Sequence, residues 1–266
     1  MKRTLIVGNW KMNLNVSEAS ILLHRLQEKI NSHRDVEVVL SPSLVAIQPL
    51  SLQVDRRKFR LAAQNAYFKD QGAYTGEVSF TMLRDLVHYA IIGHSERRLH
   101  FDESLDTVRN KVAAAFRNDI VPILCVGETK QEKLEGETKQ VLHDQVFSAL
   151  SNLTSEDVED IVIVYEPQWT ITTFAGRPAK PDEAQSAIDF IRHQVRELYG
   201  DKAAKAVRIL YGGSVDDQTA RGYLEIEGCD GALVGAASIN YHKFAAIVDS
   251  AYRLNREDSK EKDESR

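Results

Sequence analysis

Three side chains that could together move a proton each come shortly after an apolar run of the chain. Removing a proton from a carbon beside a carbonyl needs a base, a group that polarises the carbonyl, and positive charge for the developing oxyanion. Glu166, His94 and Lys11 could fill these roles in that order. Together they indicate proton transfer at carbon on an anionic substrate.

Each of the three also has a simpler interpretation when taken alone. A glutamate before a proline at a strand end, as in Glu166-Pro167, is often a solvated or helix-starting carboxylate. A lone histidine such as His94 is more often structural, and a lone lysine such as Lys11 usually lies on the surface. The functional interpretation therefore depends on a fold that brings the three together.

Eight short runs rich in β-branched residues recur along the chain and predict its strands. Their nearly continuous apolar character is typical of strands buried on both faces of a parallel sheet. The runs are Thr4 to Val7, Val36 to Leu40, Leu61 to Ala63, Tyr89 to Ile92, Val121 to Val126, Ile161 to Tyr165, Val207 to Tyr211, and Ala232 to Val234.

Helical patterns lie between these runs, because apolar residues there recur at three- and four-residue spacing. The clearest are Ser17 to Lys29, Ser104 to Arg117, Gln140 to Leu150, and Pro181 to Tyr199. Eight alternating units favour an α/β fold of the closed (β/α)8 TIM-barrel type, in a single domain spanning 1–254, over an open doubly wound sheet. The charged segment 255–266 has no apolar residue and predicts a disordered tail.

The bulk composition excludes several classes of protein. With 43% hydrophobic and 27% charged residues the chain suits a globular protein, and its net charge of -5 argues against general nucleic-acid binding. Cys125 and Cys229 have no spacing that suits zinc or a disulfide framework, so we expect no metal and a cytoplasmic setting. No signal peptide is apparent and no apolar run is long enough to span a membrane.

Four separated segments resemble the signature blocks of the triosephosphate isomerase family, in the same order and at similar spacing. They are Asn9-Trp10-Lys11-Met12-Asn13, Gly93-His94-Ser95-Glu96-Arg97-Arg98, Tyr165-Glu166-Pro167, and Tyr211-Gly212-Gly213-Ser214-Val215. The resemblance runs from residue 3 to residue 252. It implies a cofactor-free isomerase of glycolysis and gluconeogenesis that interconverts dihydroxyacetone phosphate and D-glyceraldehyde 3-phosphate.

The resemblance also implies roles for individual residues. Asn9, Lys11, His94 and Glu166 would be catalytic, with Glu166 as the base and His94 as a neutral electrophile. Asn9 and Lys11 would also bind substrate. Other phosphate contacts would come from Thr172, Ser214, Gly235 and Ala236, chiefly through backbone amides that glycines allow the anion to approach.

Further residues would act through their neighbours. By resemblance, Glu96 supports Lys11 and Asn9, Arg97 belongs to an ion-pair network near a dimer contact, and Cys125 packs near the catalytic glutamate without reacting. The segment 64–77 resembles the loop with which one subunit reaches into its neighbour. Thr75 would then lie beside the partner's Asn9 and Lys11, and the protein would be a homodimer.

The sequence departs from the family pattern at the lid and at the phosphate site. The segment Gln168 to Lys180 is longer than the usual lid, and Thr172 and Ala236 stand where glycines are usual. Phe80 replaces a proline or small residue, a change that the sequence does not explain. The departures leave two alternatives open: an isomerase of a four-carbon ketose phosphate such as erythrulose phosphate, and a non-catalytic scaffold or binding barrel.

Overall fold

The eight predicted strands are confirmed and close into a barrel. The computed structural model describes residues 2–171 and 178–264, with side chains described as far as Glu257. All strands are parallel and pair in chain order, and β1 pairs with both β2 and β8. The strands are β1 (Thr4–Asn9), β2 (Val36–Ser41), β3 (Phe59–Ala63), β4 (Tyr89–Ile92), β5 (Val121–Val126), β6 (Val162–Tyr165), β7 (Arg208–Tyr211) and β8 (Gly231–Val234).

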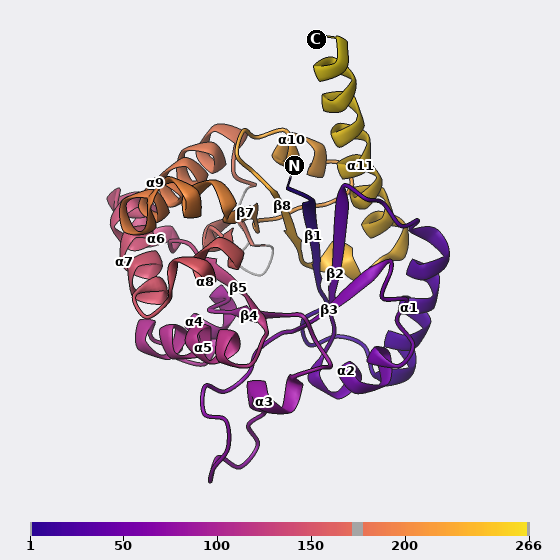
Figure 1. Ribbon diagram of the computed structural model, residues 1–266, viewed down its shortest axis with the longest axis horizontal. Coiled ribbons are helices and arrows are strands. Elements are labelled where there is room, and N and C mark those ends of the chain that lie inside the picture. The colour runs from indigo at the N-terminus through magenta and orange to yellow at the C-terminus, as the bar shows by residue number, and fades with distance from the viewer. Residues whose placement is uncertain (1, 172–177, 265–266) are drawn as a thin grey trace.

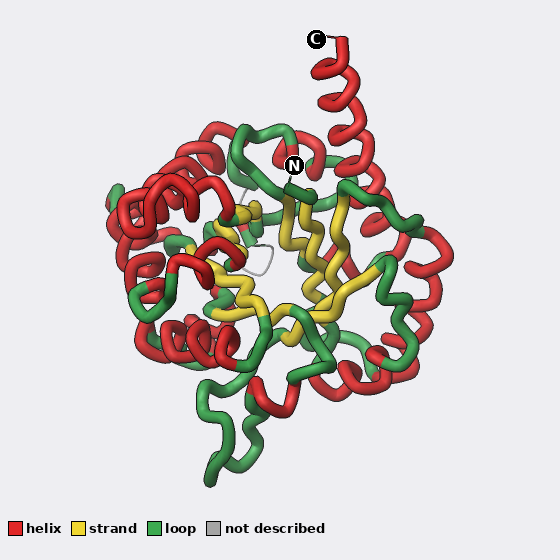
Figure 2. The backbone as a smooth tube through the Cα atoms, in the orientation of Figure 1, coloured by secondary structure: helices red, strands yellow, loops and turns green. Residues whose placement is uncertain are grey.

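Helices surround the ring of strands, so the α/β closed barrel in a single domain is also confirmed (Figures 1 and 2). They are α1 (Val16–Lys29), α2 (Leu44–Ser51), α3 (Phe80–Leu83), α4 (Ser95–His100), α5 (Leu105–Arg117), α6 (Lys130–Glu135), α7 (Thr138–Leu150), α8 (Ser155–Asp160), α9 (Pro181–Ala206), α10 (Ala220–Leu224) and α11 (Tyr241–Glu264). Two short 3-10 turns, η1 (Gln168–Thr170) and η3 (Ala236–Ile239), follow β6 and β8.

Both faces of the strands are buried, which explains why the runs are apolar throughout. Leu5 and Val7 of β1 pack with residues such as Leu233 inside the barrel. Ile6, which lies between them, packs outward against the helices. Successive side chains of a strand point to opposite faces, so most positions of these strands meet apolar neighbours, and the exceptions include Glu37, Arg60 and Arg208 near the strand starts.

The predicted helices begin where the sequence supplies suitable caps. Asn15 accepts a hydrogen bond from the amide of Glu18, whose side chain accepts one from the amide of Asn15, and α1 follows. Pro181 occupies the first turn of α9. This helix runs past the predicted end at Tyr199 to Ala206, across a break at Gly200 where φ is 81°.

The end of the chain, from Asn255, was expected to be a charged, disordered tail. The backbone of α11 remains helical to Glu264 and projects away from the barrel (Figure 1). Asn255 bonds Thr4 and the carbonyl of Asp35, and Glu257 pairs with Arg221, so the start of the charged segment is tied to the barrel. The division of the chain into a domain 1–254 and a separate tail stays a prediction.

The loop between β3 and α3 also projects from the barrel wall (Figure 1). It is braced internally, because Tyr67 packs against Tyr74 with ring centroids 4.7 Å apart and its amide donates to Val78. Phe80, the residue that the sequence left unexplained, is fully buried at the start of α3 and anchors the end of the loop in the core. No helix among the described residues is long and apolar enough to cross a membrane.

Candidate active site

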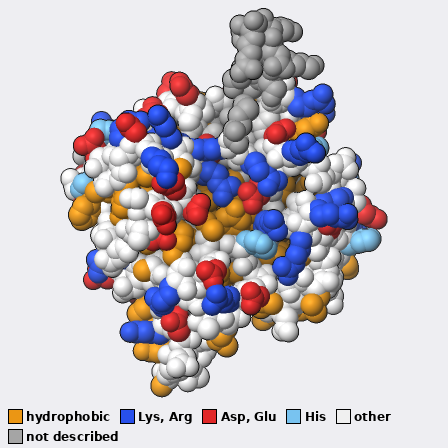
Figure 3. Space-filling model, viewed as in Figure 1, with side chains coloured by type: hydrophobic (Ala, Val, Ile, Leu, Met, Phe, Trp, Pro, Cys, Tyr) orange, Lys and Arg blue, Asp and Glu red, His pale blue; other side chains and the backbone are white. Residues whose placement is uncertain are grey.

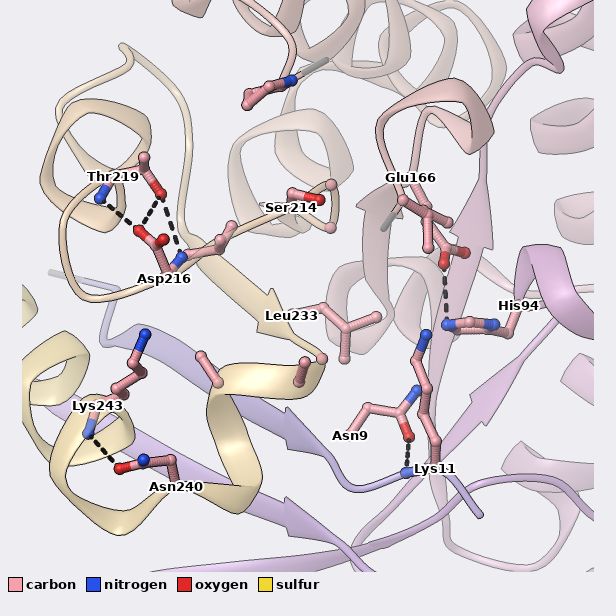
Figure 4. Close-up of a pocket in the computed structure, with 18 residues that line it drawn as sticks. Asn9, Lys11, His94, Glu166, Ser214, Asp216, Thr219, Leu233, Asn240 and Lys243 are labelled. Carbon is pink, nitrogen blue, oxygen red and sulfur yellow. Dashed lines mark hydrogen bonds and ion pairs between the residues drawn. The ribbon is translucent and has the colours of Figure 1, made fainter. Parts of the chain in front are cut away.

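A cavity of about 420 Å³ lies at the end of the barrel where the strands finish. It gathers most of the residues that the sequence singled out (Figure 4). Those that line it are Asn9, Lys11, His94, Glu166, Ser214, Gly235 and Ala236. Thr172 lies outside the described residues, and Ile171 and Pro178, on either side of the undescribed segment, also line the cavity.

Glu166 is held by three hydrogen bonds from the segment after β4. The Ser95 amide and hydroxyl donate to its two carboxylate oxygens at 3.0 and 2.9 Å. His94 Nε2 lies 2.9 Å from Oε1 of the same carboxylate. The sequence analysis assigned no role to Ser95, although its place directly after His94 was the available signal.

The hydrogen bonds of His94 indicate which ring nitrogen carries the proton. Its Nδ1 accepts from the backbone amide of Glu96 at 3.3 Å. Because an amide can only donate, Nδ1 must be unprotonated, and a neutral ring then carries its proton on Nε2. The histidine therefore presents an N–H donor to Glu166 and to the cavity.

The surroundings of Glu166 act on its pKa in opposite directions. Burial disfavours the carboxylate and would raise the pKa, whereas the hydrogen bonds from His94 and from the Ser95 amide and hydroxyl favour the ionised form. The pKa of Glu166 is lowered on balance. The group is therefore ionised at neutral pH and can accept a proton.

Lys11 takes an unusual backbone conformation that aims its amine into the cavity. Its φ is 53°, and the Asn9 side chain accepts from its amide at 3.0 Å. Gln64 donates to the Lys11 carbonyl at 2.8 Å, so the backbone is fixed on both sides. The amine donates to Glu96 Oε1 at 2.7 Å, which is the contact that the resemblance implied.

The opposite wall of the cavity is built mainly from backbone. A Cβ on Gly213 would lie 2.2 Å from the Tyr211 hydroxyl and 2.6 Å from Thr170 Oγ1, so only glycine allows this approach. The Ser214 hydroxyl donates to the Thr170 carbonyl at 2.5 Å and ties the end of β7 to η1. Gly212 and Gly213 thus have a packing role beyond that of a simple tight turn.

The end of β8 completes this wall. A Cβ on Gly235 would lie 3.6 Å from Lys11 Cε and 4.0 Å from its Nζ, so the lysine reaches across to β8. Ala236 opens η3, and Asn240, just before α11, and Lys243, in its first turn, line the same cavity (Figure 4). The sequence analysis missed Lys243, whose signal was a basic residue in the first turn of the helix after the predicted phosphate loop.

Cys125 lies next to Glu166 inside the barrel, as the sequence analysis expected. It is buried, and burial followed by the nearby Glu166 carboxylate raises the pKa of its thiol well above the usual value. A thiol in such a site is unreactive at neutral pH.

Gly93, with φ of 72°, lets the side chain of Arg98 approach and donate to the Gly93 carbonyl at 2.8 Å.

A buried ion cluster connects this part of the barrel with the projecting loop. Glu103 accepts from Arg97 and from Lys111, and the Lys111 amine also donates to Asn65 at the base of the loop, at 2.7 Å. Arg97 therefore lies in the ion-pair network that the resemblance implied. Thr75, farther along the loop, is exposed and does not line the cavity.

A buried polar contact holds the first residues of the segment after Glu166. Glu128 is fully buried and accepts from the Trp169 indole at 2.8 Å and from the Tyr165 hydroxyl at 3.1 Å. These bonds fix η1 at the point where the undescribed part of the lid begins. Within the described residues, no cluster of His, Cys, Asp and Glu could hold a metal ion.

Comparison with known proteins gives a consistent result over the whole barrel. The family model described as triosephosphate isomerase matches residues 4–251. The chain is 43% identical over 250 residues to the triosephosphate isomerase of Clostridium tetani, covering 94% of this chain and 97% of that one. It is 40% identical over 253 residues to that of Chloroherpeton thalassium, covering 94% and 100%, and 39% identical over 251 residues to that of Dehalococcoides mccartyi, covering 94% and 97%.

Proposed function

The chain belongs to the triosephosphate isomerase family, and we propose that it interconverts dihydroxyacetone phosphate and D-glyceraldehyde 3-phosphate through an enediol, as an isomerase of glycolysis and gluconeogenesis. One observation carries the proposal: the Glu166 carboxylate and His94 Nε2, 2.9 Å apart, share a cavity with the Lys11 amine. No finding favours the four-carbon substrate or the non-catalytic scaffold.

The proton-transfer step follows from the hydrogen bonds of these groups. A substrate carbonyl oxygen would replace the Glu166 carboxylate as the acceptor of the His94 Nε2–H. Glu166 would take the proton from the adjacent carbon while the electron pair moves to that oxygen, where His94 and Lys11 stabilise the charge. His94 would then give its Nε2 proton to this oxygen and take the proton of the neighbouring hydroxyl, while Glu166 returns its proton to the former carbonyl carbon. The second oxygen thereby becomes the carbonyl, and both side chains are regenerated. The hydrogen bonds from Ser95 would keep the carboxylate in place throughout.

The phosphate group would lie against the backbone wall opposite. The amides of Ser214, Gly235 and Ala236 would donate to it, with the Lys11 amine between phosphate and reacting carbons. Asn9 would support the substrate from β1. Thr172 is proposed as a further amide donor from the lid, on the resemblance alone. The Lys11 amine would supply local positive charge for the phosphate on a chain whose net charge is -5.

We propose a homodimer because the family resemblance implies one, and exposed apolar residues support this proposal. Met12, Val45, Met82 and Phe101 have exposed fractions of 97%, 71%, 64% and 63%. They lie in the segments that follow β1, β2, β3 and β4, which are neighbours in the barrel, so they share one side of the molecule. A second copy would cover this side, and Thr75 would reach its Asn9 and Lys11.

Val45→Glu tests the dimer, because it places a charge on the proposed interface. We expect sedimentation to show dissociation into monomers with lower activity per chain. Leu134→Glu is the matched control, since Leu134 is 74% exposed on α6, away from these four strands. A dimer that is equally stable in both variants would contradict this interface.

The cytoplasm is the proposed compartment. Cys125 and Cys229 are both free thiols, which suits a reducing environment.

The activity itself is tested by measuring kcat/KM with glyceraldehyde 3-phosphate and with erythrulose phosphate. We expect a value for the triose near the diffusional ceiling of about 10⁸–10⁹ M⁻¹s⁻¹ and a much lower one for the four-carbon sugar. Glu166→Asp, which withdraws the carboxylate, should sharply lower kcat with little change in KM, whereas Glu135→Asp on exposed α6 should change neither. Absence of turnover on both sugars would overturn the proposal.

A further inference from the structure

A second cavity opens on the opposite face of the barrel, where the strands begin. Its volume is about 540 Å³, and its lining includes Arg56, Arg60 and His88. Figure 3 shows this face: Lys and Arg side chains, with a His among them, gather around the middle, where hydrophobic side chains are visible between them. None of these lining residues belongs to the catalytic cavity.

The hydrogen bond between Arg60 and His88 shows which groups of this cavity donate hydrogen bonds and which accept them. Arg60 Nη1 lies 3.3 Å from His88 Nε2, and a guanidinium can only donate, so Nε2 is the acceptor. The neutral ring then carries its proton on Nδ1, which is buried and has no hydrogen-bond partner among the described residues. His88 therefore offers the cavity no acceptor, and the remaining N–H groups of Arg60 stay available.

The carboxylates around the cavity are mostly committed to other arginines. Glu37 accepts from Arg208 at 3.0 Å, and Asp119 is paired with Arg84. Asp85 is left to offset Arg56 and Arg60, neither of which has an ion pair within the described part of the chain. With Arg208 paired to Glu37 and Arg84 paired to Asp119, Arg56 and Arg60 face one remaining carboxylate, so the cavity has one positive charge in excess on a protein whose net charge is -5.

We propose that this cavity is a second anion site, which binds the phosphate dianion of inorganic phosphate or of a small phosphate monoester through Arg56 and Arg60. Planar guanidinium groups donate in pairs to phosphate oxygens, and two guanidinium groups without an ion pair among the described residues favour an anion over a neutral polar molecule. The site does not depend on the proposed isomerase activity, because it shares no residue with the catalytic cavity.

His88 provides a local reporter for the site. Burial, followed by the charges of Arg60 and Arg56, lowers the pKa of His88, while Glu37 acts in the opposite direction. Arg84, Asp85 and Asp119 line the same cavity. An anion bound to the arginines would cancel part of their effect, so the pKa of His88 would rise on binding.

The experiment is an NMR titration of the histidine ring protons of the full chain with inorganic phosphate and with glycerol 3-phosphate, at constant ionic strength set with chloride. His88→Gln and His94→Gln assign reporters for the two cavities. We expect a saturable rise in the pKa of His88 with one or both probes, and their relative affinities distinguish free phosphate from a monoester. Lys11→Met should weaken binding at the catalytic cavity and leave the His88 response intact.

Arg56→Gln with Arg60→Gln should weaken the response at His88 by at least about tenfold. If the double variant does not fold, the same titration is made with Arg56→Gln alone, which changes an exposed position. The matched control is Arg57→Gln, because Arg57 is 88% exposed and pairs with Asp55 outside the cavity lining. The proposal is overturned if His88 does not respond to either probe, or if the response survives in the Arg56 and Arg60 variants.

Discussion

The two walls of the catalytic cavity are held in place by different means. On the proton-transfer wall, side chains are fixed by other side chains and amides: Ser95 and His94 hold Glu166, and Glu96 holds Lys11. On the phosphate wall, the backbone of Gly213 packs closely against the Tyr211 and Thr170 side chains, and the Ser214 hydroxyl donates to the Thr170 carbonyl. The chemistry of the first wall thus depends on residue type, and that of the second on backbone shape.

Among the variants that test this difference, Glu166→Gln should have the largest effect, because it keeps the shape of the side chain and removes its basicity. We expect kcat to fall by about 10³-fold or more while KM changes little, because a positioned general base contributes about 10²–10⁴-fold. Steady-state kinetics with both triose phosphates would measure it. A fall in kcat of less than tenfold would show that the proton-transfer wall does not depend on Glu166.

Gly213→Ala tests the phosphate wall by adding one methyl group. The new Cβ would lie 2.2 Å from the Tyr211 hydroxyl and 2.6 Å from Thr170 Oγ1, so the end of β7 or η1 must shift. Overpacking of this kind costs about 1–3 kcal/mol. We expect a lower melting temperature and a higher KM, with a smaller effect on kcat.

Gly222→Ala is the control for this substitution. Gly222 lies in α10, and a Cβ there meets no atom within 4 Å. Because alanine favours helix more than glycine does, this variant should be as stable as the unmodified chain or slightly more so. If Gly213→Ala behaves in the same way, the phosphate wall is not fixed by backbone packing.

The same difference explains what could be predicted from the sequence. The strands were predictable because burial on both faces requires continuous apolar runs, and Glu166, His94 and Lys11 because their side chains carry the chemistry. Ser95 was missed because its role arises only where the segments after β4 and β6, which flank β5, come into contact. Sequence patterns do not show such contacts between strands.

The phosphate wall and the end of the chain were harder to predict for a physical reason. Backbone amides carry no residue type, so Gly235 and Ala236 were assigned by resemblance, and Lys243 was overlooked although it lines the cavity. The segment after Asn255 was expected to be irregular, because it lacks apolar residues. The backbone of α11 continues through it to Glu264, since Glu, Lys and Arg are good helix formers once a preceding helix supplies the nucleus.

A smaller effect is expected from Ser95→Ala, which removes one of the hydrogen bonds to Glu166 and keeps the amide. Hydrogen bonds to the ionised form lower a pKa, so their loss should raise the pKa of Glu166. The acid limb of the kcat/KM profile should then move to higher pH. Near this limb the rate should fall by about 2- to 10-fold, as expected for one hydrogen bond.

The profile of Ser95→Ala contains its own control. At high pH Glu166 is ionised in both proteins, so most of the difference in kcat/KM should disappear there. A loss of rate that is equal at all pH values would instead mean that Ser95 positions the carboxylate without affecting its ionisation. The proton-transfer wall would then resemble the phosphate wall, where geometry alone matters.

The smallest expected effect is that of Ala236→Gly, which restores the residue usual in the family. The methyl group of Ala236 lies at the edge of the cavity, at an exposed position, and the proposed contact to phosphate is made by the amide, which both residues have. We therefore expect KM to change by less than about threefold, with kcat unchanged, because the interaction free energy that changes is smaller than that of one hydrogen bond. A tenfold fall in KM would show that the side chain obstructs the phosphate, and that residue type matters on this wall as well.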